Sequence, residues 1–151
     1  MDTPHQPEKV PTLLALLGVV PLALIALLPP QLFASMNLFG FLYLTLIYCF
    51  LGGTQWGMAL DKENQDDWLF YLSMIPVIVS FIAIYLYSIL TVIHVSLWGV
   101  LIVALIWQCT FDCHLVKQDL LPLWYRKLRI TSTYVLVFFA IICLVRILLS
   151  R

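Results

Sequence analysis

The chain has 151 residues, of which 63% are hydrophobic and 11% are charged, and its mean hydropathy is +1.02. Soluble globular domains carry roughly 25% charged residues, so this composition excludes a soluble domain and predicts an all-α membrane protein. Eight Lys and Arg residues balance eight Asp and Glu residues, which leaves no basic surplus of the kind that nucleic-acid binding requires.

Five apolar runs follow a polar N-terminal tail at residues 1–11, and each is long enough to cross about 30 Å of hydrocarbon. The predicted spans cover about residues 12–30, 37–60, 68–87, 93–112 and 130–149. A basic interfacial segment, 117–129, precedes the last span. The sequence therefore predicts one domain, residues 12–151, built as a bundle of five transmembrane helices.

The first span contains Pro21 and ends at Pro29 and Pro30. A proline inside a span removes one backbone donor and usually kinks the helix, so we expect a kink at Pro21. The tail before this span has Lys9 as its single cation and lacks the Arg-rich composition of an organelle transit peptide. We therefore expect a bacterial inner membrane rather than a mitochondrial one.

The second span carries the densest packing chemistry, in the segment Gly52-Gly53-Thr54-Gln55-Trp56-Gly57. Gly53 and Gly57 have the small-xxx-small spacing that lets two helices approach closely in a bilayer. The amide of Gln55 needs a partner from another helix or from a pocket. The segment predicts either a glycine-lined packing seam or, with Trp56, the wall of a small cavity.

The acidic loop 61–67 leads to the third span, where Pro76 predicts a bend. The fourth span ends at Asp112, a carboxylate that is costly in a membrane unless it is paired. Its candidate partners are Arg126 and Arg129, which with Lys127 form a predicted charge belt at the inner face. This belt is a structural clamp in one interpretation and a substrate or lipid-phosphate site in another.

The segment before the last span predicts a helix start, with Asp119 as the N-cap and Pro122 in the first turn. Trp124 and Tyr125 would dock at the membrane interface. Arg146, close to the end of the last span, is expected to extend to the head groups.

The four cysteines, Cys49, Cys109, Cys113 and Cys143, lie in or beside apolar runs, which argues against an extracellular disulfide framework. Cys109 and Cys113 are one helical turn apart, and with His114 they resemble part of a metal site. A second pair of ligands is missing, so we expect no metal and no cofactor. Standard enzyme motifs are also absent, and we expect a protein that is not an enzyme.

Six of the eight cations fall on the side of the N-terminus and of the two charged loops, at Lys9, Lys62, Lys117, Arg126, Lys127 and Arg129. The positive-inside rule then predicts a cytoplasmic N-terminus and a periplasmic C-terminus.

Three segments together resemble a known family: Leu17 to Pro21, Phe50 to Gly57, and Pro122 to Arg129. The family is the transmembrane protein 69-like family (domain of unknown function 3429), found in bacterial inner-membrane proteins and in the mitochondrial protein called transmembrane protein 69. This resemblance implies a small helical membrane protein and brings no established activity.

Three functions are compatible with these patterns. The leading hypothesis is an accessory, assembly or scaffolding subunit that acts through helix contacts with lipid, other membrane proteins or a second copy of itself. The alternative is a carrier or binding protein for a small molecule or lipid, with a pocket near Gln55, Trp56 and Asp112. The third is a cofactor-binding redox protein that uses Cys109, Cys113 and His114.

Overall fold

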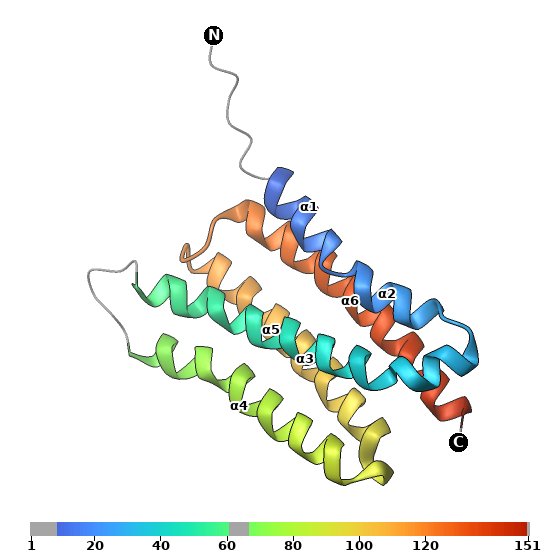
Figure 1. Cartoon of the computed structure of the whole chain (residues 1–151). Coiled ribbons are helices and arrows are strands. Elements are labelled where there is room, and N and C mark those ends of the chain that lie inside the picture. Colours follow the sequence, from blue (N-terminus) through green and yellow to red (C-terminus); the bar gives the residue numbers. More distant parts are fainter. Residues whose placement is uncertain (1–8, 61–66, 151) are drawn as a thin grey trace.

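The computed structural model describes residues 9–60 and 67–150, and the described chain is helical (Figure 1). The elements are α1 (Lys9–Leu17), α2 (Val20–Leu27), α3 (Pro30–Leu60), α4 (Trp68–Ile89), the short 3-10 helix η1 (Thr91–Ile93), α5 (His94–Lys117) and α6 (Leu123–Leu149). With α1 and α2 counted as one span, five helical segments are long and apolar enough to cross a membrane. The predicted all-α membrane fold is confirmed.

The helices run up and down along one common direction (Figure 1). At one end α1 begins, α3 ends, α4 begins, α5 ends and α6 begins. We call this the charged end, after Lys9, Asp67, Lys117, Arg126 and Lys127. Helix α3 contacts α2, α4 and α5, while α6 contacts α1, α2 and α5. These two helices therefore hold the bundle together.

The first span is broken rather than bent. Helix α1 ends at Leu17 and α2 begins at Val20. Because Pro21 has no N–H, it cannot donate to the carbonyl of Leu17 four residues earlier. The hydroxyl of Tyr43, on α3, donates to the carbonyl of Gly18 at 2.5 Å. The kink expected at Pro21 thus takes the form of a break one turn earlier, supported by a neighbouring helix.

Helix α3 begins at Pro30, seven residues before the predicted start at 37. The pair Pro29-Pro30 does end the preceding helix, but the second proline also begins the next one, since its fixed φ suits a first helical turn. At about 1.5 Å per residue, the 31 residues of α3 extend about 46 Å. The helix is longer than the hydrocarbon layer and reaches beyond it.

Rings from three helices pack together at the end opposite the charged end. The Tyr87 ring stacks on Phe41, with centroids 4.1 Å apart, and on His94, with centroids 3.8 Å apart. The Asn37 amide donates to the Tyr87 hydroxyl at 2.8 Å, and Phe41 meets Trp98 edge-on. These contacts fix α3, α4 and α5 to one another.

Arg146 points into the bundle rather than to the head groups. Its Nη1 donates to the carbonyl of Ala26 at 2.7 Å, and its guanidinium carbon lies 4.2 Å from the centre of the Phe33 ring. The Ala26 carbonyl is free because the residue four positions later is Pro30, which has no N–H. The expected extension to the membrane surface is therefore wrong, since a nearer acceptor is available.

Candidate functional site

A buried ionic network joins three helices near the charged end. The Nε of Arg129, on α6, donates to Asp112 Oδ2, on α5, at 2.5 Å. The amide of Gln55, on α3, donates to Asp112 Oδ1 at 3.3 Å. All three residues are at most 3% exposed. The sequence left Arg126 and Arg129 as alternative partners of Asp112, and the structure selects Arg129.

The Asp112 carboxylate at the centre of this network is fully bonded within the chain. It has a hydrogen bond on each oxygen, and one of them comes from the Gln55 amide nitrogen, which thus finds its partner on another helix. Trp56 lies elsewhere: it is 43% exposed and packs edge-on against Phe70 of α4. The predicted pocket near Gln55, Trp56 and Asp112 is therefore wrong, because Trp56 faces away from the other two.

The predicted seam at Gly53 and Gly57 is also wrong within this chain, since a Cβ added at either residue meets nothing within 4 Å. The glycine in close contact is Gly52. A Cβ there would lie 2.7 Å from the carbonyl oxygen of Ser73 and 3.0 Å from Pro76 Cγ. The small residue that lets α3 and α4 approach thus stands one position before the expected pair, on the face that also buries Gln55.

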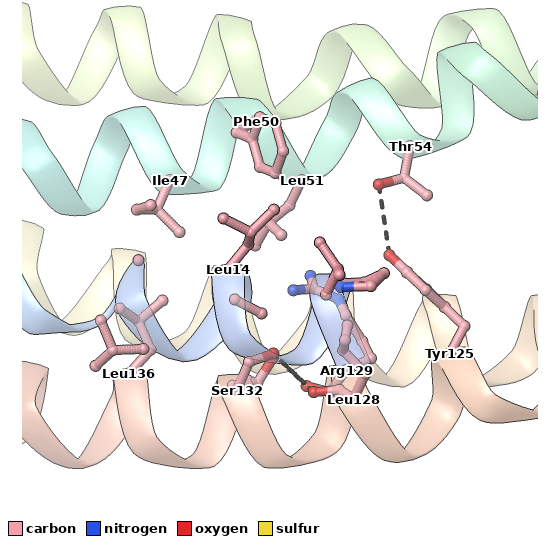
Figure 2. A pocket seen from close by; sticks show the side chains of 16 residues that line it. Leu14, Ile47, Phe50, Leu51, Thr54, Tyr125, Leu128, Arg129, Ser132 and Leu136 are labelled. Carbon is pink, nitrogen blue, oxygen red and sulfur yellow. Dashed lines mark hydrogen bonds between the residues drawn. The ribbon is translucent and has the colours of Figure 1, made fainter. Parts of the chain in front are cut away.

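A crevice of about 440 Å³ opens between α1, α3 and α6. We call it the α1–α3–α6 crevice. Its lining consists of Val10, Pro11, Leu14, Ala15, Gly18 and Val19 of the first span, Ile47, Phe50, Leu51 and Thr54 of α3, and Tyr125, Leu128, Arg129, Ser132, Thr133 and Leu136 of α6. Figure 2 shows these side chains converging from the three helices. The walls are mostly apolar, and most polar groups come from one face of α6.

Two of these polar groups lack a partner. Nη2 of Arg129 and Oγ1 of Thr133 are buried and have no hydrogen-bond partner among the described residues. In Figure 2 the Arg129 guanidinium reaches from α6 into the space between the helices. The Tyr125 hydroxyl donates to Thr54 Oγ1 over a long 3.4 Å, and Ser132 Oγ donates to the Leu128 carbonyl at 2.8 Å. The crevice therefore offers unused donors within an apolar lining.

A second groove, of about 530 Å³, lies between α5 and α6 on the other side of the network. Its lining includes all three weak metal candidates, Cys109, Cys113 and His114, together with Lys117 and Arg126. The Cys109 thiol donates to the Arg129 carbonyl at 3.8 Å, and His114 Nε2 lies 3.2 Å from Nε2 of Gln118. The described residues contain no group of three or more His, Cys, Asp or Glu residues that could hold a metal ion.

The predicted charge belt does not form a single surface. Arg129 turns inward to Asp112, Arg126 lines the groove between α5 and α6, and Lys127 is exposed. The predicted docking pair stays together: the Trp124 ring meets the Tyr125 ring edge-on, and the Tyr125 hydroxyl donates to Thr54 of α3.

Asp119 does not cap α6. It has a left-handed φ of 57°, and Pro122 is the residue before the first helical turn. Sequence reasoning also missed Thr133, whose burial follows from helix spacing: it lies one turn after Arg129 on the same face of α6.

Comparison with protein families gives one match. Residues 7–145 match the family described as "Protein of unknown function (DUF3429)", and the comparisons with curated proteins and with solved structures return no match. The narrower likeness to transmembrane protein 69 stays a prediction. Because the match extends over most of the chain, this protein belongs to the DUF3429 family.

Proposed function

We propose that this protein is a non-enzymatic membrane protein that binds a lipid-soluble molecule in the α1–α3–α6 crevice. The observation that carries the proposal is a buried guanidinium nitrogen without a partner, Nη2 of Arg129, within an otherwise apolar lining. Buried polar groups in apolar surroundings are costly unless they are hydrogen-bonded. A ligand that enters the crevice and accepts this bond would remove that cost.

The size and lining of the crevice support this proposal. Its volume of about 440 Å³ falls within the roughly 300–1,000 Å³ that is typical of small-molecule sites, which combine apolar walls with a few placed polar groups. The three helices that form it belong to segments apolar enough to cross a membrane. A ligand would therefore reach the crevice from the lipid.

Helix α1 is the wall that is held least firmly. It contains no buried residue, it contacts α6, and it is separated from α2 by the break at Gly18 and Val19. A segment with few buried contacts opens at lower free energy than the core. Outward movement of α1 about this break would admit a ligand without disturbing the buried network.

The proposal contains no enzymatic role because of the residue types that line the crevice. The lining residues of the described chain include hydroxyl groups and one guanidinium, but no Asp, Glu, His or Cys. General-base and nucleophilic catalysis depend mainly on those four side chains, or on a hydroxyl activated by one of them. The crevice is therefore better suited to binding than to bond cleavage.

The test uses a long-chain alkyl ketone that carries a photoactivatable diazirine. After illumination of the protein in membranes, we expect labelled peptides from α1, α3 and α6, and we expect Ala15→Trp to remove the label because the indole fills the crevice. Ala34→Trp, at an exposed position of α3 outside the crevice, is the matched control and should leave labelling unchanged. Labels spread evenly over all lipid-exposed helices, with no effect of Ala15→Trp, would contradict the proposal.

A second candidate retains the accessory or scaffolding role. One stripe of α3, at Leu46, Phe50, Gly53, Gly57 and Leu60, is exposed. Its two glycines have no neighbour within 4 Å, although their spacing favours close helix pairing in membranes. For a second copy of this chain as the partner, the double variant Gly53→Leu, Gly57→Leu should turn a dimer into a monomer. A wild-type chain that is monomeric in mild detergent and in liposomes would exclude this self-association.

A further inference from the structure

The unused donor in the α1–α3–α6 crevice belongs to a side chain whose charge is already compensated. Arg129 is 3% exposed, and its Nε is bonded to Asp112, which is 0% exposed. This is the only ion pair among the described residues. The pair is therefore neutral as a unit, yet Nη2 is buried without an acceptor among the described residues.

This charge balance selects among ligands. Arg129 is the only ionisable residue, apart from the hydroxyl of Tyr125, in the described lining of the crevice. A carboxylate or phosphate bound there would add a second anion beside one buried cation, and a buried anion without its own counter-charge is strongly disfavoured. A neutral acceptor oxygen would take the same hydrogen bond without that cost.

A second unused donor lies on the same helix. Thr133 follows Arg129 by four residues, so their backbone positions are about 6 Å apart along the axis, on one face of α6. Thr133 is 6% exposed and lines both the crevice and the groove between α5 and α6, and its hydroxyl has no partner among the described residues. A ligand with two acceptor oxygens would therefore use both donors, while its apolar part lies against Leu14 and Ala15 of α1.

We infer that the crevice selects a neutral, carbonyl-bearing lipid, whose carbonyl oxygens accept hydrogen bonds from Arg129 Nη2 and from the Thr133 hydroxyl. This inference rests on the proposed ligand site. The carbonyls belong either to a ring diketone with an apolar tail or to the esters of a diacylglycerol. Anionic lipids and plain hydrocarbons are excluded from the preferred class.

The experiment compares four ligands on the purified full-length chain in mild detergent, by native mass spectrometry. They are a decyl benzoquinone, a dioctanoylglycerol, oleate, and squalene as the hydrocarbon without an acceptor. We expect the chain to retain the quinone or the diacylglycerol at least about fivefold better than oleate or squalene, as the net contribution of one hydrogen bond would give. The quinone and diacylglycerol arms separate the two sources of the carbonyl.

A charge variant makes the test sharper. Asp112→Asn keeps the shape of the side chain but leaves Arg129 as an uncompensated cation, so the preference should reverse in favour of oleate. Asp67→Asn removes an acid immediately before α4. Helix α4 does not line the crevice, so this variant should leave the ligand preference unchanged. Equal retention of oleate and the carbonyl ligands by the wild type would overturn the inference, as would an unchanged preference in a folded Asp112→Asn chain.

A milder pair of variants covers the case in which Asp112→Asn does not fold. Thr133→Val removes the unused hydroxyl and should reduce carbonyl retention about threefold or more, while squalene retention stays the same. Thr110→Val removes a hydroxyl outside the crevice that already donates to the Trp107 carbonyl, and it should not change the preference. Equal effects of the two variants would refute the role of Thr133. If the wild type retains none of the four ligands and the diazirine ketone labels no crevice peptide, the proposed function itself fails.

Discussion

Gly52 shows how a single hydrogen in place of a methyl group sets the distance between two helices. The atom nearest to a Cβ at this position would be the Ser73 carbonyl oxygen, at 2.7 Å, which belongs to the α4 backbone and cannot rotate away. Pro76, three residues after Ser73, is also close: its Cγ would lie 3.0 Å from the added Cβ. The close approach of α3 and α4 therefore depends on the absence of a side chain at Gly52.

We predict that Gly52→Ala lowers the free energy of unfolding by about 1–3 kcal/mol, as expected for overpacking against backbone. Gly53→Ala is the matched control, since nothing lies within 4 Å of its added Cβ. Its better helix propensity should leave stability unchanged or raise it by up to about 1 kcal/mol. Thermal unfolding of both variants in detergent measures the difference, and equal midpoints would contradict the close contact.

The sequence is informative about polar residues of the spans and less so about glycines. Gln55 and Asp112 stand out because an amide and a carboxylate in apolar runs each need a partner, and the structure supplies one for both. The spacing of Gly53 and Gly57 defines a face of α3, but spacing alone does not say whether a neighbouring helix covers that face. The position of α4 decides this, and it selects the adjacent face with Gly52.

At the scale of the elements, Arg146 connects the last helix to the connection between α2 and α3. Its bond to the Ala26 carbonyl and its position over the Phe33 ring join three helices through one side chain. We predict that Arg146→Met, which keeps an apolar stem but removes the donor, destabilises the chain by about 1–3 kcal/mol. Hydrogen exchange of the amides at residues 25–33 should become faster.

Arg126→Met is the control for this change, because Arg126 is exposed and makes no ion pair within the described chain. Faster exchange in α2 and α3 for both variants alike would mean that the loss of a cation, rather than the loss of the bond to Ala26, causes the effect.

The sequence predicts helix boundaries where its composition changes sharply, but not where contacts with other helices determine them. The end of α2 and the start of α4 follow from Pro29 and from the acidic segment before Trp68. Two prolines determine the other boundaries. Pro21 leaves the Leu17 carbonyl without its helical donor, where α1 and α2 separate, and Pro30 begins α3 earlier than predicted. At each place a distant helix contributes a hydrogen bond, from Tyr43 to the Gly18 carbonyl and from Arg146 to the Ala26 carbonyl.

At the scale of the whole molecule, the two ends of the bundle are held by different chemistry. The charged end is held by Gln55, Asp112 and Arg129, and the opposite end by the stacked rings of Phe41, Tyr87 and His94. The first set is polar and directional, whereas the second gains most of its energy from apolar area. The unusual residue types of the first set indicate that Gln55 and Asp112 need partners, but the second set consists mainly of aromatic residues, which are common in apolar spans.

The distribution of cations predicts that the charged end faces the bacterial cytoplasm. Alkaline phosphatase fused at the C-terminus should then be active, since the enzyme folds only outside the cytoplasm, and the same enzyme fused after Gln118 should be inactive. A green fluorescent protein fused at each site provides the opposite readout as a control. An active phosphatase after Gln118 together with an inactive one at the C-terminus would reverse the orientation.

The contacts of α1 also constrain how the protein is made. Helix α1 is synthesised well before α6, the helix against which it packs. Until α6 has been inserted, α1 lacks this packing partner. The α1–α3–α6 crevice is therefore complete only after α6 has joined the bundle.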